Sequence, residues 1–314
     1  MDTVYILTSP VAFIIFNRPD KAQKSFDAIA KARPKKLLVI ADGARTHVAG
    51  EKERCDETRA IIDQVNWDCE VLKNYSENNL GCKQRLASGL DWVFNNVPEA
   101  IILEDDCLPA PSFFQYCDEL LAYYRNDERV GMISGDNFQE GIWRGEGDYY
   151  FSRFCHIWGW ATWARAWKKY DVNASSWPAL KAHDWLTSLG FKGSEKKHWE
   201  EAFESVYTKS LDTWDHQWNL ACWQHEMLAI TPNVNLISNI GFGEGATHTT
   251  GPSIHSDMET VDLRFPLKHP NDVKRDFLAD EFSSRNLFTK SYIKRGIRKL
   301  RAIFRLNNLG LFSN

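Results

Sequence analysis

Apolar runs alternate with amphipathic segments over the first 134 residues, and this alternation constrains the fold more than any other feature. The runs have the length and β-branched content of buried strands and cover residues 11–16, 36–41, 70–73, 100–103 and 130–134. Between them, segments with helical periodicity cover residues 21–33, 51–64, 82–95 and 113–124. Strands that alternate with helices predict a doubly wound, mostly parallel α/β sheet of Rossmann-like type. Such sheets bind ligands outside the carboxyl ends of their strands.

Three consecutive carboxylates, Glu104, Asp105 and Asp106, follow the fourth apolar run and precede a proline-containing turn and a predicted helix. Adjacent acids repel one another, so they require either a neutralising cation or full exposure to water. Oxygen-rich clusters suit Mn²⁺ or Mg²⁺, which keeps positions for water and for substrate phosphates. A solvated acidic turn is the alternative. The strand before the acids and the turn and helix after them favour the metal site.

Composition excludes several classes of protein. The 314 residues are 43% hydrophobic and 25% charged, which is ordinary for a globular protein of one large or two small domains. Seven cysteines without zinc-type spacing predict reduced thiols in a cytoplasmic protein. A net charge of -4 gives no general argument for nucleic-acid binding. We see no signal peptide and no apolar run long enough to span a bilayer, so we expect a cytoplasmic or membrane-surface location.

The second half of the chain is harder to interpret. Residues 135–169 are rich in Trp, Tyr and Gly, residues 174–209 have polar helical character, and residues 228–231 resemble a strand. Thirteen tryptophans could line a sugar site or fill a core, and composition cannot separate these alternatives.

The end of the chain is strongly basic. Residues 251–289 read as a loop-rich extension, whereas residues 290–306 carry seven basic side chains and no acid. Ile293, Ile297, Leu300 and Phe304 form one helical stripe. This pattern predicts a basic amphipathic helix that binds an anionic membrane, here the cytoplasmic face of the inner membrane. The alternative is a helix docked on its own acidic domain.

Six motifs in this order resemble a known enzyme family. They are FNRP at 16–19, IADGA at 40–44, LEDD followed by PAPSFFQY at 103–116, GWATW at 159–163, TWDHQW at 213–218 and FGEGATH at 242–248. Their order is similar to that in the eukaryotic N-acetylglucosaminyltransferases that initiate complex N-glycans. Bacterial glycosyltransferases of surface-polysaccharide clusters are also similar. The likeness extends over about residues 11–250.

The resemblance implies a GT-A fold over residues 1–250, with a nucleotide-sugar half at 9–134 and an acceptor half at 135–250. It implies a metal-dependent, inverting glycosyltransferase of polysaccharide biosynthesis. The donor would be a nucleoside-diphosphate sugar, with a UDP-sugar expected, and the acceptor a glycan or lipid-linked sugar.

The resemblance also implies roles for individual residues. Donor contacts would come from Arg18, Asp42, Lys83, Arg85, Glu104 and Asp105, and Asp106 would be the direct metal ligand. Asp215 would be the catalytic base. The family has two acids at that point, whereas this chain has Asp215 followed by His216, which leaves Asp212 as a competitor. His248 would complete the metal site, and Trp158, Trp160 and Trp163 would stack on sugars in the acceptor site.

Each role has a simpler structural alternative. Asp42 could be a turn residue, Arg18 could pair with Asp20, Asp215 could cap a helix at 214–223, and His248 could be an exposed loop residue. The three tryptophans could equally fill the core.

Two other functions remain open. A sugar-1-phosphate nucleotidyltransferase would be expected to show a Gly-rich, basic loop after its first strand, and residues 17–20 are not one. A non-catalytic carbohydrate-binding protein would use the Trp-rich surface without metal or nucleotide.

Overall fold

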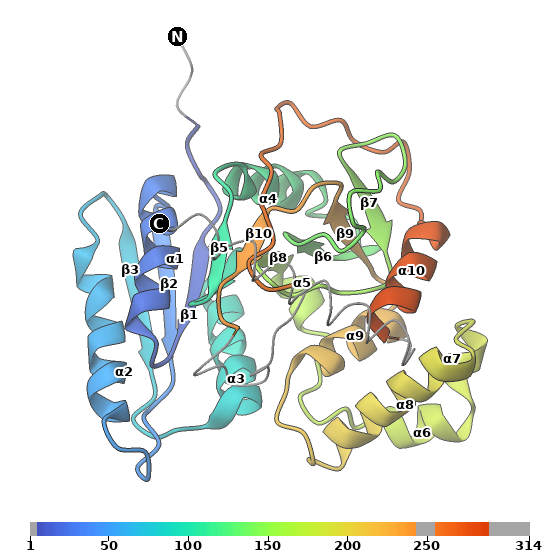
Figure 1. The fold of residues 1–314 in the computed structure, drawn as a ribbon, viewed down its shortest axis with the longest axis horizontal. Helices are drawn as coiled ribbons and strands as arrows, with labels where there is room; N and C mark the ends of the chain where they lie inside the picture. Colours follow the sequence, from blue (N-terminus) through green and yellow to red (C-terminus); the bar gives the residue numbers. More distant parts are fainter. Residues whose placement is uncertain (1–4, 243–254, 289–314) are drawn as a thin grey trace, which may run out of the picture.

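A mixed eight-stranded sheet forms the centre of the computed structural model, which describes residues 5–242 and 255–288 (Figure 1). In spatial order its strands are β3 (Glu70–Tyr75), β2 (Lys36–Ala41), β1 (Val11–Ile15), β4 (Glu99–Glu104), β8 (Trp160–Trp163), β6 (Val130–Ser134), β9 (Leu228–Pro232) and β7 (Tyr149–Ser152). β1 to β4, β6 and β9 share one direction, whereas β8 and β7 run against them. The expected mostly parallel α/β sheet is therefore confirmed.

Both faces of the sheet are buried because successive side chains of a strand point to opposite sides. In β2, Leu37 and Val39 join the core beneath α1 (Pro19–Ala32) and α4 (Ser112–Tyr123). Leu38 belongs to a second core. The second core lies beneath α3 (Gly81–Asn96), α8 (Gly193–Tyr207) and α9 (Asp215–Gln224). Continuous apolar runs are what such doubly covered strands require.

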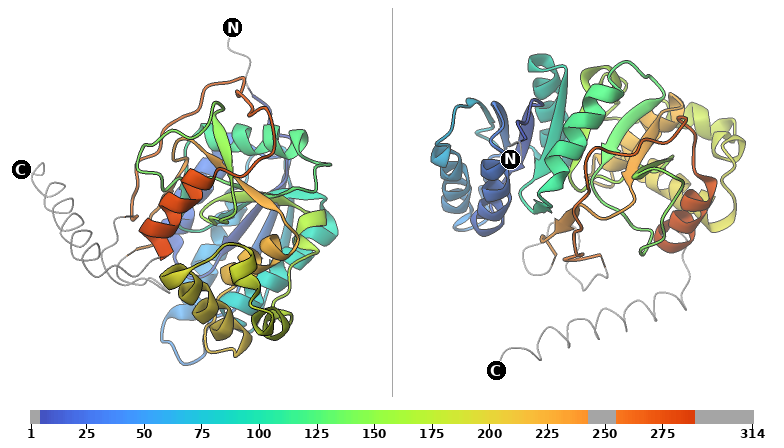
Figure 2. Two further views of the ribbon diagram at one scale, coloured as in Figure 1. Left: turned by 90° about the vertical axis from the view of Figure 1, so that its right-hand side faces the viewer. Right: turned by 90° about the horizontal axis from the view of Figure 1, so that it is seen from above.

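Shorter elements complete the fold. They are α2 (Glu51–Ala60), η1 (Ile61–Gln64), α5 (Ala164–Trp167), α6 (Trp177–Ala182), α7 (Trp185–Ser188), α10 (Phe277–Ser283) and η2 (Ser284–Phe288). β5 (Cys107–Pro109) and β10 (Ile237–Asn239) pair as a separate antiparallel ribbon. Figures 1 and 2 show α10 at the opposite end of the molecule from α2 and β3.

The structure departs from the sequence-based expectation in the second half. Residues 174–209 form three helices rather than a continuous helical segment. Asp184, Gly190 and Gly193 lie between these helices or begin one, and each has a positive φ that a regular helix does not allow. The 251–289 extension contains α10 and η2, and the predicted helix at 290–306 lies outside the described residues. No described helix is long and apolar enough to cross a membrane.

Candidate functional site

Polar residues that follow β1, β2 and β4 meet at one edge of the sheet because these strands are parallel neighbours. Ile14 of β1 lies in register with Glu104, and Ile15 lies in register with Ala41, the residue before Asp42. The strand pairing alone therefore brings Arg18, Asp42 and the three acids to the same edge.

The acid cluster, defined as Glu104, Asp105 and Asp106, shares one guanidinium. Arg18 pairs with Asp105 and lies 3.0 Å from an Asp106 carboxylate oxygen. Asp105 also accepts a hydrogen bond from the Phe16 amide at 3.2 Å. Within the described residues, Glu104 has no side-chain hydrogen bond or ion pair. Three carboxylates with one cation leave an excess of negative charge.

Two carboxyl groups of the cluster have raised pKa values. Burial raises the pKa of Glu104, and the charges of Asp106 and Asp105 raise it further. Burial also raises the pKa of Asp105, although Arg18 opposes that effect. An added cation would favour the ionised forms of both side chains. The electrostatics of the site therefore suit a divalent ion.

The chain that follows β10 packs directly on Asp106. The Ile240 amide donates to the Asp106 carbonyl oxygen at 2.9 Å. A methyl group added at Gly241 would lie 2.7 Å from the Asp106 Cγ, closer than carbon atoms pack. The motif at 242–248 thus begins beside the acid cluster, but His248 lies outside the described residues.

The described residues contain no set of three or more His, Cys, Asp or Glu side chains arranged as a complete metal cage. Mg²⁺ commonly binds through one or two carboxylates, with waters and substrate phosphates filling its other positions. The acid cluster offers carboxylate oxygens of the kind that this second arrangement uses, with Asp105 and Asp106 both within reach of Arg18.

Asp215 and Asp212, which the sequence left as competitors, have different surroundings. Asp212 accepts hydrogen bonds from the Cys82 and Lys83 amides, each at 3.1 Å, and so caps α3. Asp215 begins α9, accepts from the Thr213 hydroxyl, and lies near enough to Glu104 to raise its pKa. Of the two acids, Asp215 is therefore the one whose charge acts on Glu104.

Asp42 is held by its own chain. Its carboxylate accepts from the Leu80 amide at 2.9 Å, from the Gly81 amide and from the Asn79 side chain. Gly43 is required beside it, because an added methyl would lie 2.5 Å from the Asn78 carbonyl carbon. These contacts close the loop before α3 onto the end of β2.

The two cations of α3 also differ. Arg85 is buried and donates to the Asn74 carbonyl oxygen at 2.6 Å, so it ties α3 to β3. Lys83, in the first turn of α3, is only partly buried and makes no ion pair within the described residues. Of the pair, Lys83 is therefore the one whose side-chain cation is not held by a hydrogen bond or ion pair within the described residues.

Two of the three predicted acceptor-site tryptophans are buried. Trp160 stacks on Trp214 with ring centroids 5.4 Å apart, and Trp163 donates its indole N–H to the Leu121 carbonyl oxygen at 3.1 Å. They are 1% and 2% exposed, in opposite cores, so neither ring offers a face to a sugar. This burial corrects the stacking expectation for both and agrees with the core alternative.

Trp158 differs from the other two because it is only partly buried. Its ring packs against Phe138 at 5.3 Å and against Phe242 at 5.6 Å, next to the Gly241 contact with Asp106. An aromatic wall therefore lies near the acid cluster.

Sequence reasoning missed Asp136, which follows β6 at the same edge of the sheet. It is 1% exposed; one carboxylate oxygen accepts from the Trp158 amide at 3.3 Å, and the other has no hydrogen-bond partner. Burial raises its pKa well above the ordinary value. The polar residues after the apolar run at 130–134 were the available signal.

No protein-family model and no curated protein matches this chain. Similar solved structures include a UDP-glucose pyrophosphorylase complexed with UDP-glucose, with 9% identity and a TM-score of 0.37 over 72% of this chain and 90% of that one. Another is a cytidylyltransferase from Leptospira borgpetersenii serovar Hardjo-bovis, with 10% identity and a TM-score of 0.32 over 52% of this chain and 63% of that one. At these values the chain is assigned to neither class.

Proposed function

We propose that this protein is a metal-dependent glycosyltransferase that moves a sugar from a nucleoside-diphosphate sugar to a hydroxyl group of a glycan or lipid-linked acceptor. The observation that carries the proposal is the acid cluster at the sheet edge, with three carboxylates sharing Arg18 and with Asp215 nearby. The motif resemblance gives the reaction class.

Mn²⁺ or Mg²⁺ bound at Asp106 would supply positive charge for the diphosphate as it leaves. Arg18 and Lys83 are the cationic side chains at this edge that could contact the phosphates, and such fixed charges stabilise developing anions. Glu104 and Asp105 would contact the nucleotide and sugar.

Asp215 is proposed as the general base. The acceptor oxygen bonds to the anomeric carbon, the bond from that carbon to the phosphate oxygen breaks, and the hydroxyl proton passes to the Asp215 carboxylate. The nucleoside diphosphate departs with the electron pair of the broken bond. Attack from the face opposite the leaving group inverts the anomeric configuration.

A sugar-1-phosphate nucleotidyltransferase is the second candidate, since the names of both similar structures belong to nucleotidyl-transferring enzymes. One feature of this chain opposes it. β1 is followed by only three residues before α1 begins at Pro19, which leaves no Gly-rich loop for a triphosphate. The low similarity of the two structures does not offset that feature.

The products distinguish the two reactions. Nucleotide sugars are first screened by thermal shift with and without Mn²⁺, because a ligand stabilises in proportion to the logarithm of its concentration over its dissociation constant. The responding donor is then incubated with acceptors. Nucleoside diphosphate with a new glycoside supports glycosyl transfer, whereas pyrophosphate formed from nucleoside triphosphate and sugar phosphate supports the second candidate.

Both enzymatic assignments fail if no nucleotide sugar raises the melting temperature of the protein. They also fail if Asp106→Ala shows the same thermal shift as the wild type. Glycan binding that needs neither metal nor nucleotide and survives Asp106→Ala would indicate a carbohydrate-binding protein instead.

A further inference from the structure

The polarity of α10 is inverted. The helix buries Ala279, Asp280 and Ser283, while Phe277 is 64% exposed and Leu278 is 68% exposed. A helix at the surface of a globular protein normally turns its apolar side chains inward. This helix instead presents Phe277 and Leu278 to the outside.

Buried polar contacts fix α10 in that orientation. Asp280 accepts hydrogen bonds from the Ser152 hydroxyl of β7 and from the Arg275 guanidinium. Gln139 donates to the Ser283 hydroxyl at 2.9 Å and to the Ala279 carbonyl oxygen at 3.2 Å. The outward position of Phe277 and Leu278 is therefore set by the inner face of the helix.

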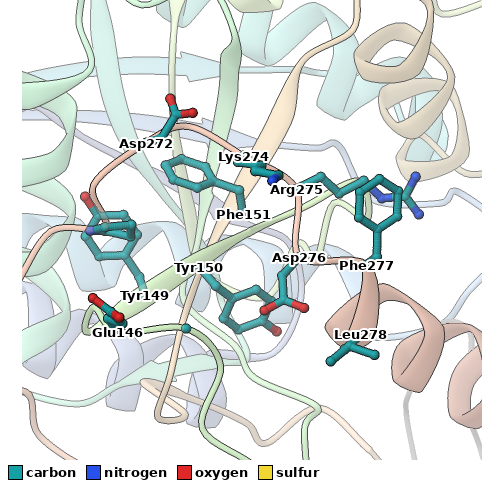
Figure 3. Close-up of a pocket in the computed structure, with 12 residues that line it drawn as sticks. Glu146, Tyr149, Tyr150, Phe151, Asp272, Lys274, Arg275, Asp276, Phe277 and Leu278 are labelled. Atoms are coloured by element: carbon teal, nitrogen blue, oxygen red, sulfur yellow. The ribbon is translucent and has the colours of Figure 1, made fainter.

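A second segment extends the exposed apolar surface. Ile142 is 43% exposed and Trp143 is 52% exposed, and Ile142 lines a shallow hollow together with Leu278. Leu278 and Phe277 line a neighbouring hollow along β7, shown in Figure 3. We call Ile142, Trp143, Phe277 and Leu278 the α10 patch. Single exposed apolar residues are common, but a contiguous group indicates a binding surface.

We propose that the α10 patch contacts an anionic lipid membrane. From α10 the chain passes directly through η2 into residues 290–306, whose seven basic side chains have no acid among them. Weak membrane binding becomes stable when apolar insertion is combined with a polybasic segment. Each Lys or Arg near an anionic surface adds to the attraction.

The side-chain types of the patch fit this surface. Tryptophan is enriched where hydrocarbon meets lipid headgroups, and phenylalanine and leucine insert below that level. The charged side chains that line the two hollows balance, with four acids (Glu146, Asp272, Asp276 and Glu281) and four bases (Arg144, Lys274, Arg275 and Arg285), so the described rim adds little net attraction. Attraction to anionic lipid comes from the basic segment, and the α10 patch supplies the insertion.

The test is flotation of the full-length protein with vesicles of phosphatidylethanolamine and phosphatidylglycerol, compared with vesicles of phosphatidylcholine alone. The wild type should bind the anionic vesicles, and added salt should weaken that binding. The double variant Phe277→Ser/Leu278→Ser should lose about tenfold in affinity for each side chain at every salt concentration. Tyr207→Ser, in a residue 41% exposed at the end of α8, is the matched control and should bind as the wild type.

If the double variant does not fold, Trp143→Ser tests the patch independently, because Trp143 lies in the second segment. It should also weaken binding to the anionic vesicles. The proposal is overturned if the wild type does not bind vesicles, or if folded patch variants bind as tightly as the wild type. A concentration-dependent dimer that the double variant abolishes, without vesicle binding, would assign the patch to a second copy of this chain. None of these results depends on the enzymatic reaction.

Discussion

Glu51 and the acid cluster are two sets of carboxylates near one edge of the same sheet, yet their surroundings act on them in opposite directions. Glu51 is fully buried and receives hydrogen bonds from the Arg45 side chain and amide and from Asn17. The Arg45 hydrogen bond is the largest cause that lowers the pKa of Glu51 to about 2. In the cluster, three carboxylates share Arg18, and the pKa of Glu104 and of Asp105 is raised.

The difference lies in the number of donors available to each carboxylate. Glu51 has a cation and two further donors to itself, so its charge is satisfied by the fold. The cluster has more acid than the fold neutralises, which costs stability and leaves capacity for a ligand. Asn17 and Arg18 are neighbours in the chain, and each serves one of the two sites. A surplus of buried acid over donors therefore distinguishes the proposed binding site from a structural contact.

The largest expected effect is on catalysis. Asp106→Ala should lower metal-dependent turnover by about 1,000-fold or more, because a bound cation contributes several kcal/mol of charge stabilisation. Glu51→Gln, at the paired site, should retain turnover at temperatures where it is folded. Steady-state assays with the identified donor measure both variants. Equal losses would remove the distinction between the two sites.

The second effect separates the two candidate bases. Asp215→Asn should lower transfer by about 100-fold or more, since a general base is lost, while donor affinity stays nearly unchanged. Asp212→Asn keeps one acceptor oxygen at the cap of α3, so it should cost less than about 1 kcal/mol of stability, with transfer preserved. Kinetics and denaturation of both variants provide the test. Substantial turnover in Asp215→Asn, with loss in Asp212→Asn, would reverse the assignment.

Removing the shared cation should affect stability. Arg18→Ala leaves Asp105 and Asp106 without their ion pairs, and breaking a buried pair costs about 3 kcal/mol or more. Added Mn²⁺ should restore part of that loss, because it neutralises the same carboxylates. Urea denaturation with and without Mn²⁺ measures this. A variant whose stability does not respond to Mn²⁺ would contradict cation binding at the cluster.

The smallest effect is the pH dependence, which has opposite signs at the two sites. Glu51, with its lowered pKa, contributes stability that is present above the ordinary carboxyl pKa and is lost as the pH falls toward 2. Glu104, with its raised pKa, contributes stability that is present below the ordinary pKa and is lost as the pH rises through the raised value. Each linked proton changes stability by at most about 1.4 kcal/mol per pH unit.

Denaturation at a series of pH values, without metal, isolates these two contributions. Glu51→Gln should flatten the acid limb of the stability curve, and Glu104→Gln should flatten the limb that descends from the ordinary carboxyl range toward neutral pH. If the stability curve of Glu104→Gln is parallel to that of the wild type, ionisation of Glu104 does not lower the free energy of unfolding, and repulsion within the cluster is absent.

Much of the sheet could be predicted because each strand is encoded by the apolar residues of its own segment. Each apolar run of the first half became a strand, and parallel pairing then placed Arg18, Asp42 and Glu104 at one edge of the sheet. The acid cluster was visible because three adjacent carboxylates are unusual after a buried strand. Predicting the individual strands and the acid cluster needed no knowledge of which strands are neighbours.

What could not be predicted depends on distant partners. β8 inserts antiparallel between β4 and β6, and this position buries Trp160 and Trp163 on opposite faces. The donors to Asp42 come from residues 79–81, and no local pattern indicates them. The inverted polarity of α10 depends on Asp280 meeting Ser152, which is 128 positions earlier. Each failure reflects a tertiary contact rather than a misread periodicity.

The fit of Gly241 against Asp106 has a consequence for the evolution of this chain. A methyl group at position 241 would displace the carboxylate while leaving every charge unchanged. We therefore expect that any relative with an aspartate at position 106 also has a glycine at position 241.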